Sequence, residues 1–186
     1  IRDSFQAAFK RKHILMLGSL KLYKSPLEFI ELTKRLPQFI FVLVINDTKE
    51  NINIFIKEYK INISKNLTIY PQQNDVVPFY NQTSLVLNLS NKKQFVETFG
   101  LTALEAMSAG LPVIVPTEGG IAEMVVDGEN GYKIDVQNLN QIAECIKTIL
   151  SDETLYMELA QNALAYSKRF SEAKMVNSIE MILNRK

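Results

Sequence analysis

The segment VETFGLTALEAMSAGLPVIVP, residues 96–116, decides the fold because it joins a helical pattern to an apolar strand through a glycine. Residues 101–110 are mostly strong helix formers that end in Gly110, and the apolar run at 112–116 is bounded by prolines. Two glutamates, Glu97 and Glu105, stand before and inside the helical pattern. The segment therefore predicts a helix that leads into a buried strand, with two carboxylates near the start of the helix.

Apolar runs of the same kind recur along the chain, at 13–19, 39–47, 67–71 and 84–90. Helical patterns separate them, at 23–36, 51–59 and, more weakly, 75–83. The runs are apolar throughout rather than alternating, which is typical of strands buried on both faces of a parallel sheet. The sequence predicts an α/β fold, a Rossmann-like doubly wound parallel sheet with helices on both faces.

The rhythm changes after the 112–116 strand. A glycine-rich loop region with one short strand follows at 119–135. Three helical patterns complete the chain, at 138–150, 153–169 and 171–184. No linker divides the sequence, so we expect one domain over 1–186, with residues 1–9 as a lead-in.

Composition excludes several classes of function. The chain has 186 residues, 47% hydrophobic and 22% charged, with a net charge of +1 and no basic cluster, so we expect no nucleic-acid partner. One cysteine, Cys145, and one histidine, His13, leave no disulfide and no metal cluster to be made. No apolar run reaches the length that a membrane-spanning helix needs.

Ligands of doubly wound sheets bind at the carboxyl ends of the strands, which directs attention to the loop at 91–100. The first N–H groups of the helix that follows lack internal partners and carry the positive end of its dipole. Gly100 permits close approach of a ligand to this backbone. Glu105, one turn further on, offers a carboxylate that accepts two hydroxyl groups, as in a ribose or sugar diol.

The stretch ETFGLTALEAMSAGLPVIVPTEGGIAEMVVDGENGYKI, residues 97–134, closely resembles the C-terminal donor-binding domain of retaining glycosyltransferases of the GT4-like group (glycosyl transferases group 1). These enzymes have the two-domain GT-B fold. The resemblance rests on the motif positions Glu97, Glu105, Gly110, Leu111, Pro112, Val113, Gly119, Gly120, Glu123 and Gly131. It extends more weakly over residues 10–170 and implies that this chain is one half of a GT-B fold.

The resemblance also implies roles for individual residues. Glu105 would bind the ribose hydroxyls, Glu97 would bind a hydroxyl of the donor sugar, and Lys24 would hold the phosphates, so that Glu97 and Lys24 are the catalytic candidates. The remaining donor contacts would come from Gly18, Ser19, Phe99, Gly100, Leu101 and Thr102, with Tyr70 to Gln72 facing the base.

One departure from the family concerns the phosphates. Family members commonly have an arginine directly after the glycine of the first strand, whereas Ser19 follows Gly18 here. Lys24 does occupy the position of the family's lysine. Lys21, Lys92 or Lys93 could supply the second positive charge, and the sequence does not choose among them.

The activity implied is transfer of a sugar from a nucleotide diphosphate (UDP, GDP or ADP) to an acceptor hydroxyl with retention of configuration. Neither a metal nor another cofactor is implied, and the sequence has no Asp-x-Asp. The acceptor would be a sugar or a lipid-linked saccharide, in bacterial surface polysaccharide (capsule or O-antigen) synthesis. We expect a cytoplasmic location, with the inner face of the membrane reached through the missing domain.

The resemblance implies that the acceptor-binding N-terminal domain is absent, with residues 1–9 a remnant of the interdomain linker. We therefore expect this chain to bind nucleotide without turnover.

Two other functions remain open at this point: a non-catalytic nucleotide or sugar-phosphate binding module, and half of a GT-B-like epimerase. The Gly119-Gly120 pair is equally compatible with a plain turn and with a part of the site.

Overall fold

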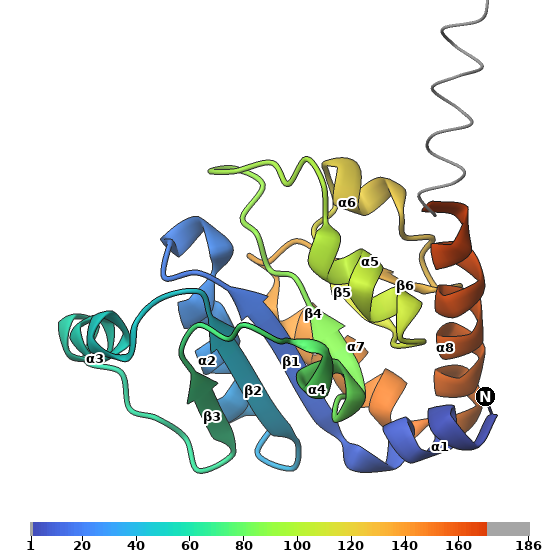
Figure 1. Cartoon of the computed structure of the whole chain (residues 1–186), viewed down its shortest axis with the longest axis horizontal. Helices are drawn as coiled ribbons and strands as arrows, with labels where there is room; N and C mark the ends of the chain where they lie inside the picture. Colours follow the sequence, from blue (N-terminus) through green and yellow to red (C-terminus); the bar gives the residue numbers. More distant parts are fainter. Residues whose placement is uncertain (1, 171–186) are drawn as a thin grey trace, which may run out of the picture.

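Six strands form one parallel sheet at the centre of the computed structural model, which describes residues 2–170 (Figure 1). The strands are β1 (His13–Gly18), β2 (Ile40–Ile45), β3 (Leu67–Tyr70), β4 (Leu85–Leu87), β5 (Val113–Val115) and β6 (Gly131–Lys133). Their order is β3-β2-β1-β4-β5-β6, and every neighbouring pair is parallel. This is the doubly wound order, in which the winding direction reverses between β1 and β4. The predicted fold class is confirmed.

The described residues form eight helices, most of which lie close to the segments where the sequence pattern predicts them. They are α1 (Arg2–Arg11), α2 (Pro26–Arg35), α3 (Lys49–Glu58), α4 (Val77–Asn81), α5 (Leu101–Ser108), α6 (Gly120–Glu123), α7 (Leu139–Ser151) and α8 (Glu153–Ser167), with short 3-10 turns η1 (Leu22–Lys24) and η2 (Lys168–Phe170). Helix α2 begins later than the pattern at 23–36 predicts. Ser25 has a left-handed backbone (φ 57°), which separates η1 from the proline that opens α2.

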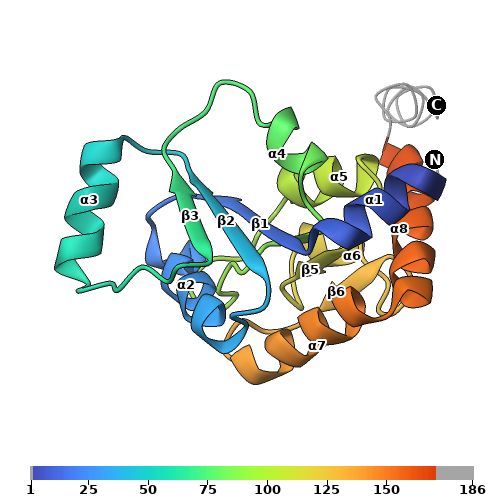
Figure 2. The same ribbon diagram turned by 90° about the horizontal axis from the view of Figure 1, so that it is seen from below.

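Helices cover both faces of the sheet (Figure 2). Helices α4 and α5 lie on one face, and α2 and α7 lie on the other. Helix α8 packs against α1, α5 and α7. No helix within residues 2–170 is long and apolar enough to cross a membrane.

The strands form the core because both of their faces are covered. Ile14, Phe41, Leu85, Val113 and Ile114 are completely buried, although they belong to four different strands. The apolar, non-alternating runs therefore predicted the environment of the strands correctly.

The N-terminal segment differs from the prediction. Residues 1–9 were assigned no secondary structure, whereas α1 is a ten-residue helix that packs on α8. Phe5, Ala8 and Phe9 are buried on one side of it, with the i, i+3, i+4 spacing of an amphipathic helix. Helix α6 was likewise not predicted within the glycine-rich region, and the helix predicted at 171–184 lies outside the described residues.

Candidate functional site

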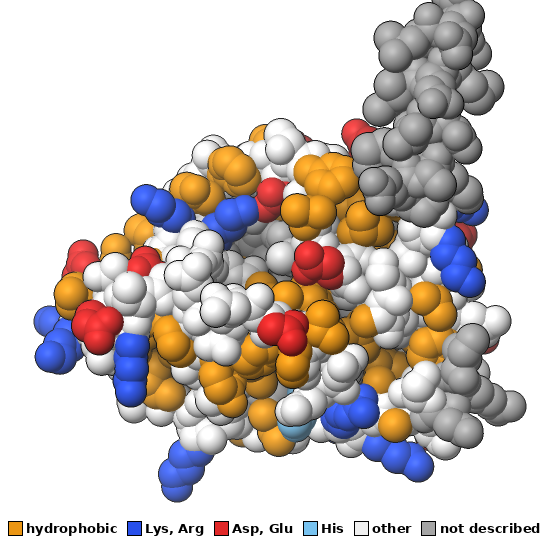
Figure 3. All heavy atoms as spheres, in the orientation of Figure 1, with side chains coloured by type: hydrophobic (Ala, Val, Ile, Leu, Met, Phe, Trp, Pro, Cys, Tyr) orange, Lys and Arg blue, Asp and Glu red, His pale blue; other side chains and the backbone are white. Residues whose placement is uncertain are grey.

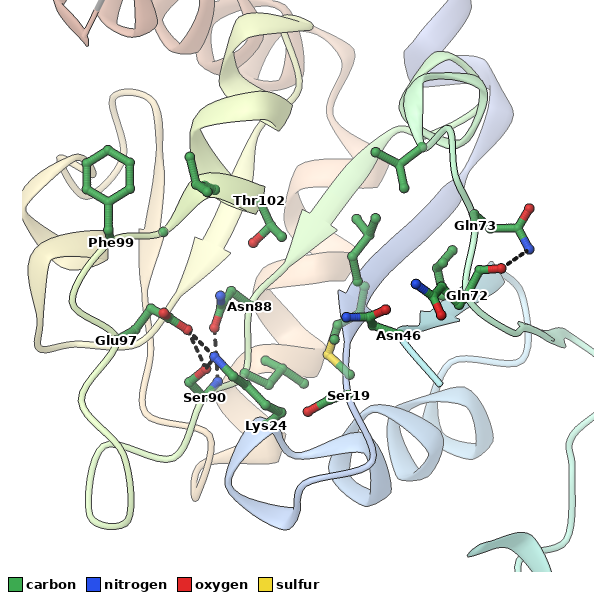
Figure 4. Close-up of a pocket in the computed structure, with 18 residues that line it drawn as sticks. Ser19, Lys24, Asn46, Gln72, Gln73, Asn88, Ser90, Glu97, Phe99 and Thr102 are labelled. Carbon is green, nitrogen blue, oxygen red and sulfur yellow. Dashed lines mark hydrogen bonds and ion pairs between the residues drawn. The ribbon is translucent and has the colours of Figure 1, made fainter. Parts of the chain in front are cut away.

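A cavity of about 500 Å³ opens where β1 and β4 end, at the reversal point of the sheet. Gly18, Ser19 and Lys24 enter it from the β1 side. Asn88, Ser90, Glu97 and the backbone from Phe99 to Thr102 enter it from the β4 side (Figure 4). Figure 3 shows this hollow from outside. Basic side chains lie along one part of its rim, and hydrophobic side chains lie along another part. The position agrees with the rule for ligand sites in doubly wound sheets.

Lys24 reaches the cavity because η1 turns the chain sharply after β1. The amide of Lys24 donates to the carbonyl of Lys21 at 2.8 Å, and that of Ser25 donates to Leu22 at 2.9 Å. The side chain then extends toward the end of β4, where its ammonium group pairs with Glu97 (Figure 4). Only 24% of the Lys24 side chain and 13% of the Glu97 side chain are exposed. The structure thus brings the two predicted catalytic residues together.

Ser90 completes this polar cluster. Its hydroxyl oxygen accepts a hydrogen bond from the Lys24 ammonium at 3.4 Å, and its hydroxyl group donates to the Glu97 carboxylate at 3.2 Å. The Ser90 amide donates to the Asn88 side chain at 3.1 Å. The cluster therefore combines one cation, one anion and two neutral polar side chains at the floor of the cavity.

A pair of aromatic rings holds the Lys24 turn against the Glu97 loop. The rings of Tyr23 and Phe95 are stacked, with centroids 4.8 Å apart. The Lys24 nitrogen lies 4.6 Å from the centroid of the Phe95 ring, within cation–π range. The amide of Asn91 donates to the Tyr23 carbonyl at 2.7 Å. These contacts therefore restrict Lys24 in addition to its ion pair with Glu97.

The loop that carries Glu97 rests on the Gly119-Gly120 turn after β5. Gly119 has φ 97°, a conformation that favours glycine. A Cβ atom on Gly119 would clash with the Glu97 carbonyl oxygen, and one on Gly120 would clash with that of Thr98. The two glycines therefore allow a close approach of two backbone segments that are distant in sequence. The Gly119-Gly120 pair therefore contacts the backbone of the loop that carries Glu97, and it does not line the cavity.

Helix α5 begins at the cavity with an open end. Gly100 is its N-cap residue, so no side chain caps the helix there. A Cβ atom on Gly100 would clash with the side chain of Ile121, which explains the absence of a larger residue. Leu101 and Thr102 line the cavity, so the positive end of the helix dipole faces it. This arrangement suits an anionic ligand.

Glu105 lies one turn further along α5 and does not line the cavity wall. Its carboxylate accepts a 2.7 Å hydrogen bond from the hydroxyl of Tyr80 on α4. Burial, together with this bond to Glu105, raises the pKa of Tyr80 well above its ordinary value. The structure thus separates the surroundings of Glu105 from those of Glu97.

The predicted base-binding segment reaches the cavity only in part. Gln72 lines the cavity, together with Gln73 and Val76, which the sequence did not single out. Tyr70 does not, because its ring packs edge-on against Phe79 at 5.0 Å. Of the two residues predicted to face the base, Gln72 therefore lies in the cavity wall and Tyr70 does not.

The sequence also missed Asn46, Asn88 and Ser90. Asn46 directly follows β2 and Asn88 directly follows β4, so a polar residue at the end of an apolar run was the available signal.

The candidates for a second cation at the phosphates are engaged elsewhere or lie outside the cavity. Lys92 pairs with Glu118 at 2.6 Å and with Asp135 at 3.6 Å. Lys93 donates to the Gln137 side chain at 2.8 Å. Neither these two nor Lys21 lines the cavity, whereas Ser19 does. Lys24 is therefore the one basic residue in the cavity wall within the described part of the chain.

No group of three or more His, Cys, Asp or Glu side chains within residues 2–170 is arranged to hold a metal ion. Cys145 is a partly buried thiol packed against the core, and burial raises its pKa to about 12. The thiol therefore stays protonated at neutral pH.

Comparisons with known proteins point to one family. The sequence profile described as glycosyl transferases group 1 matches residues 1–166. N-acetyl-alpha-D-glucosaminyl L-malate synthase of Bacillus anthracis is 30% identical over 142 residues, which are 76% of this chain and 36% of that enzyme.

Two solved structures share the fold. Anabaena HepE in complex with UDP and glucose superposes with a TM-score of 0.80 and 22% identity, covering 99% of this chain and 52% of that one. The C-terminal domain of a group 1 family protein, LpcC of Francisella tularensis, superposes with a TM-score of 0.69 and 25% identity, covering 91% of each chain.

The chain thus spans about a third of its curated relative and about half of HepE. Its profile match extends over most of its length, and its sheet has the doubly wound strand order. The chain therefore belongs to the glycosyl transferases group 1 family and corresponds to the C-terminal domain of a GT-B glycosyltransferase.

Proposed function

We propose that this chain is the donor-binding domain of a retaining glycosyltransferase that uses a nucleotide diphosphate sugar. The observation that carries the proposal is the convergence of Lys24, Glu97 and the open end of α5 on one cavity. A cation and a helix N-terminus suit a diphosphate, and a neighbouring carboxylate suits a sugar hydroxyl. HepE, which has the same fold, was crystallised with UDP and glucose.

Lys24 and Glu97 form an ion pair in the cavity. We infer that the diphosphate draws the Lys24 ammonium toward itself, which frees the Glu97 carboxylate to accept a hydroxyl of the donor sugar. After the exchange Lys24 is paired with the diphosphate and the Glu97 carboxylate keeps a hydrogen-bond donor, and this matters because a half-buried charge without any partner is costly. Ser90 remains as a neutral partner for either group.

Catalysis in this scheme is mainly electrostatic. The bond between the anomeric carbon and the diphosphate oxygen breaks, a bond to the acceptor oxygen forms on the same face, and the acceptor's proton passes to the departing diphosphate oxygen. Negative charge grows on the departing diphosphate, where Lys24 and the N–H groups at the start of α5 stabilise it. Glu97 accepts a hydroxyl of the donor sugar, and Glu105, which is exposed next to the cavity wall, accepts the ribose hydroxyls; neither transfers a proton.

The rest of the proposed reaction lies beyond this chain. We propose that the acceptor is a sugar or a lipid-linked saccharide of a bacterial surface polysaccharide, and that a second domain binds it on the cytoplasmic side of the membrane. The resemblance of the segments at 19–32 and 97–108 to such enzymes supports this part of the proposal. The cavity opens to solvent at the carboxyl edge of the sheet, where a second domain could close over it.

A thermal-shift screen with UDP-, GDP- and ADP-glucose tests the donor site. A ligand at about 100 times its Kd stabilises the folded state by about 2.7 kcal/mol. For a domain of this size that corresponds to a rise in Tm of about 5–10 °C. We expect one nucleotide to produce such a shift with wild-type protein and a much smaller one with Lys24→Ala. If no nucleotide sugar shifts the Tm at millimolar concentration, the proposed function is wrong.

A further inference from the structure

Tyr80 is a buried phenol whose position the sequence did not flag. It lies on α4 with only 5% of its surface exposed. Its hydroxyl lies 2.7 Å from the Glu105 carboxylate and 3.4 Å from the carbonyl oxygen of Thr102. Thr102 lines the donor cavity, and so does Val76, whose carbonyl accepts from the Tyr80 amide at 3.4 Å. The phenol therefore stands directly behind the cavity wall.

Helix α4, which carries Tyr80, is itself held in place by local contacts. Helix α4 is short and starts with a proline in its first turn, and the Asp75 carboxylate accepts from the Val77 amide at 3.0 Å. The Tyr80 carbonyl accepts from the Thr83 amide at 3.1 Å. Helices α4 and α5 lie next to each other on one face of the sheet (Figure 2). Both ends of the contact between Tyr80 and Glu105 are thus anchored in regular structure.

We propose that Tyr80 is a positioning residue of the donor site, which holds one oxygen of Glu105 so that the carboxylate presents its remaining lone pairs to the ribose hydroxyls. The proposal rests on the proposed function, in which Glu105 binds the ribose. Tyr80 is too buried to contact the nucleotide itself, so it acts only through Glu105.

The chemistry of the pair suits this role. An ionised carboxylate only accepts hydrogen bonds, and it has about four lone-pair sites, so one phenol leaves room for a ribose diol. A phenol in this position donates to Glu105, because burial keeps it protonated. Glutamate has a flexible side chain that loses rotamer freedom when it binds a ligand. A hydrogen bond that fixes the side chain beforehand reduces that cost at the moment of binding.

The alternative is that the contact between Tyr80 and Glu105 is purely structural and only joins α4 to α5. An experiment can separate this role from positioning. A purely structural contact affects every ligand of the cavity alike. A positioning contact affects only those ligands that carry the ribose hydroxyls. The comparison of UDP with 2′,3′-dideoxy-UDP therefore distinguishes the two roles.

The test measures the Kd of both nucleotides for wild-type chain and for Tyr80→Phe by isothermal titration calorimetry. The phenylalanine ring fills the same space and lacks only the hydroxyl. We expect Tyr80→Phe to bind UDP about two- to tenfold more weakly, because the Glu105 side chain must then be ordered at the moment of binding. Binding of 2′,3′-dideoxy-UDP should change less than twofold.

Tyr156→Phe is the matched control. Tyr156 is also buried, and its hydroxyl donates to the Ser84 carbonyl at 2.8 Å, away from the cavity. This variant also loses a buried phenol hydrogen bond, of nearly the same length as the one between Tyr80 and Glu105. It should leave the ratio of the Kd values for UDP and 2′,3′-dideoxy-UDP unchanged. Circular dichroism confirms that both variants are folded.

The possible results distinguish a failure of the positioning role of Tyr80 from a failure of the ribose contact of Glu105. If Tyr80→Phe weakens both nucleotides equally or neither, while Glu105→Gln weakens UDP selectively, Tyr80 is not a positioning residue and the ribose contact stands. If Glu105→Gln also leaves UDP binding unchanged, the ribose contact of the proposed function is wrong and the role of Tyr80 falls with it. A selective loss in both variants supports both assignments.

Discussion

Glu97 and Glu105 differ in burial and in the partners of their carboxylates. Glu97 lies on the loop before α5, and Glu105 lies in the first turns of α5. Glu97 is mostly buried and is bound by a cation and a hydroxyl that come from η1 and from the end of β4. Glu105 is exposed and is bound by one neutral phenol. Only seven residues separate the two acids, and nothing in their spacing reveals this difference. One short motif therefore places two identical groups in different electrostatic environments.

The support of the two acids differs as well. Glu97 depends on long-range contacts, because its loop rests on the Gly119-Gly120 turn. Glu105 depends mainly on the regularity of α5. Perturbations outside the cavity should therefore affect the Glu97 region first.

The largest effect should come from Gly120→Ala, which disturbs the loop of Glu97 and leaves the surroundings of Glu105 unchanged. The new Cβ atom would clash with the carbonyl oxygen of Thr98, which is backbone and cannot rotate away. We expect a loss of about 3 kcal/mol in the free energy of unfolding, at the upper end of typical overpacking costs. Urea denaturation measures it.

Gly128→Ala is the control for that experiment. Gly128 also has a positive φ, 75°, but an added Cβ would meet nothing closer than 3.9 Å. This variant should lose only about 1 kcal/mol, the cost of a left-handed backbone. Equal losses in the two variants would show that the loop of Glu97 does not depend on the Gly119-Gly120 turn.

Lys24→Ala should have the next largest effect. It removes the cation expected at the phosphates and leaves Glu97 without its ion-pair partner. We expect the affinity for UDP to fall about 30-fold, or about 2 kcal/mol, the range for a hydrogen bond to a charged group. Isothermal titration calorimetry gives the Kd directly.

Lys92→Ala provides the matched comparison. The Lys92 side chain is 23% exposed, against 24% for Lys24, and it is also ion-paired, but it lies outside the cavity. Its removal should change the affinity for UDP less than twofold. A similar loss in both variants would indicate a general electrostatic effect instead of a contact by Lys24.

Glu97→Gln should affect the sugar and spare the nucleotide. In wild-type protein the sugar should make UDP-glucose bind about tenfold more tightly than UDP, since one hydrogen bond to a charged group contributes about 1.5–3 kcal/mol in favourable cases. The substitution should remove most of this difference, because an amide is a weaker acceptor than a carboxylate. Competition binding with both ligands measures the ratio.

Equal affinities for UDP and UDP-glucose in the wild-type protein would contradict a role for Glu97 at the sugar. That result would favour a nucleotide-binding module without glycosyl transfer.

The smallest effect should come from metal ions. The described residues offer no cluster of metal ligands, and the proposed stabilisation of the diphosphate comes from Lys24 and α5. We expect excess EDTA or millimolar Mg²⁺ to change the Kd for UDP less than twofold. A strong requirement for Mg²⁺ would mean that the metal, and not Lys24, neutralises the diphosphate.

The sequence predicted the sheet because buried parallel strands have a distinctive apolar pattern. Helix α1 was missed although Phe5, Ala8 and Phe9 have helical spacing, since the segment is short and polar elsewhere. The left-handed Ser25, which sets the start of α2, has no signature in a non-glycine residue.

The site was predictable only where a motif carries it. The resemblance to the family motif named Glu97, Glu105, Lys24 and the backbone at the start of α5, which their spacing alone would not have done. Tyr80 could not be identified, because it meets Glu105 across 25 positions of chain, and a single tyrosine forms no pattern. Lys92 could not be set aside either, since its ion pairs with Glu118 and Asp135 exist only in the folded chain.

The most direct test of the central claim, that the cavity between β1 and β4 binds a nucleotide sugar, is a titration of ¹⁵N-labelled chain with UDP-glucose followed by amide chemical shifts. We predict saturable shifts at Gly18, Ser19 and residues 99–102. Amides around the smaller cavity near Leu27, Tyr59 and Leu139 should not move. Saturable shifts confined to that second cavity, or no shifts with UDP-, GDP- or ADP-glucose, would contradict the account.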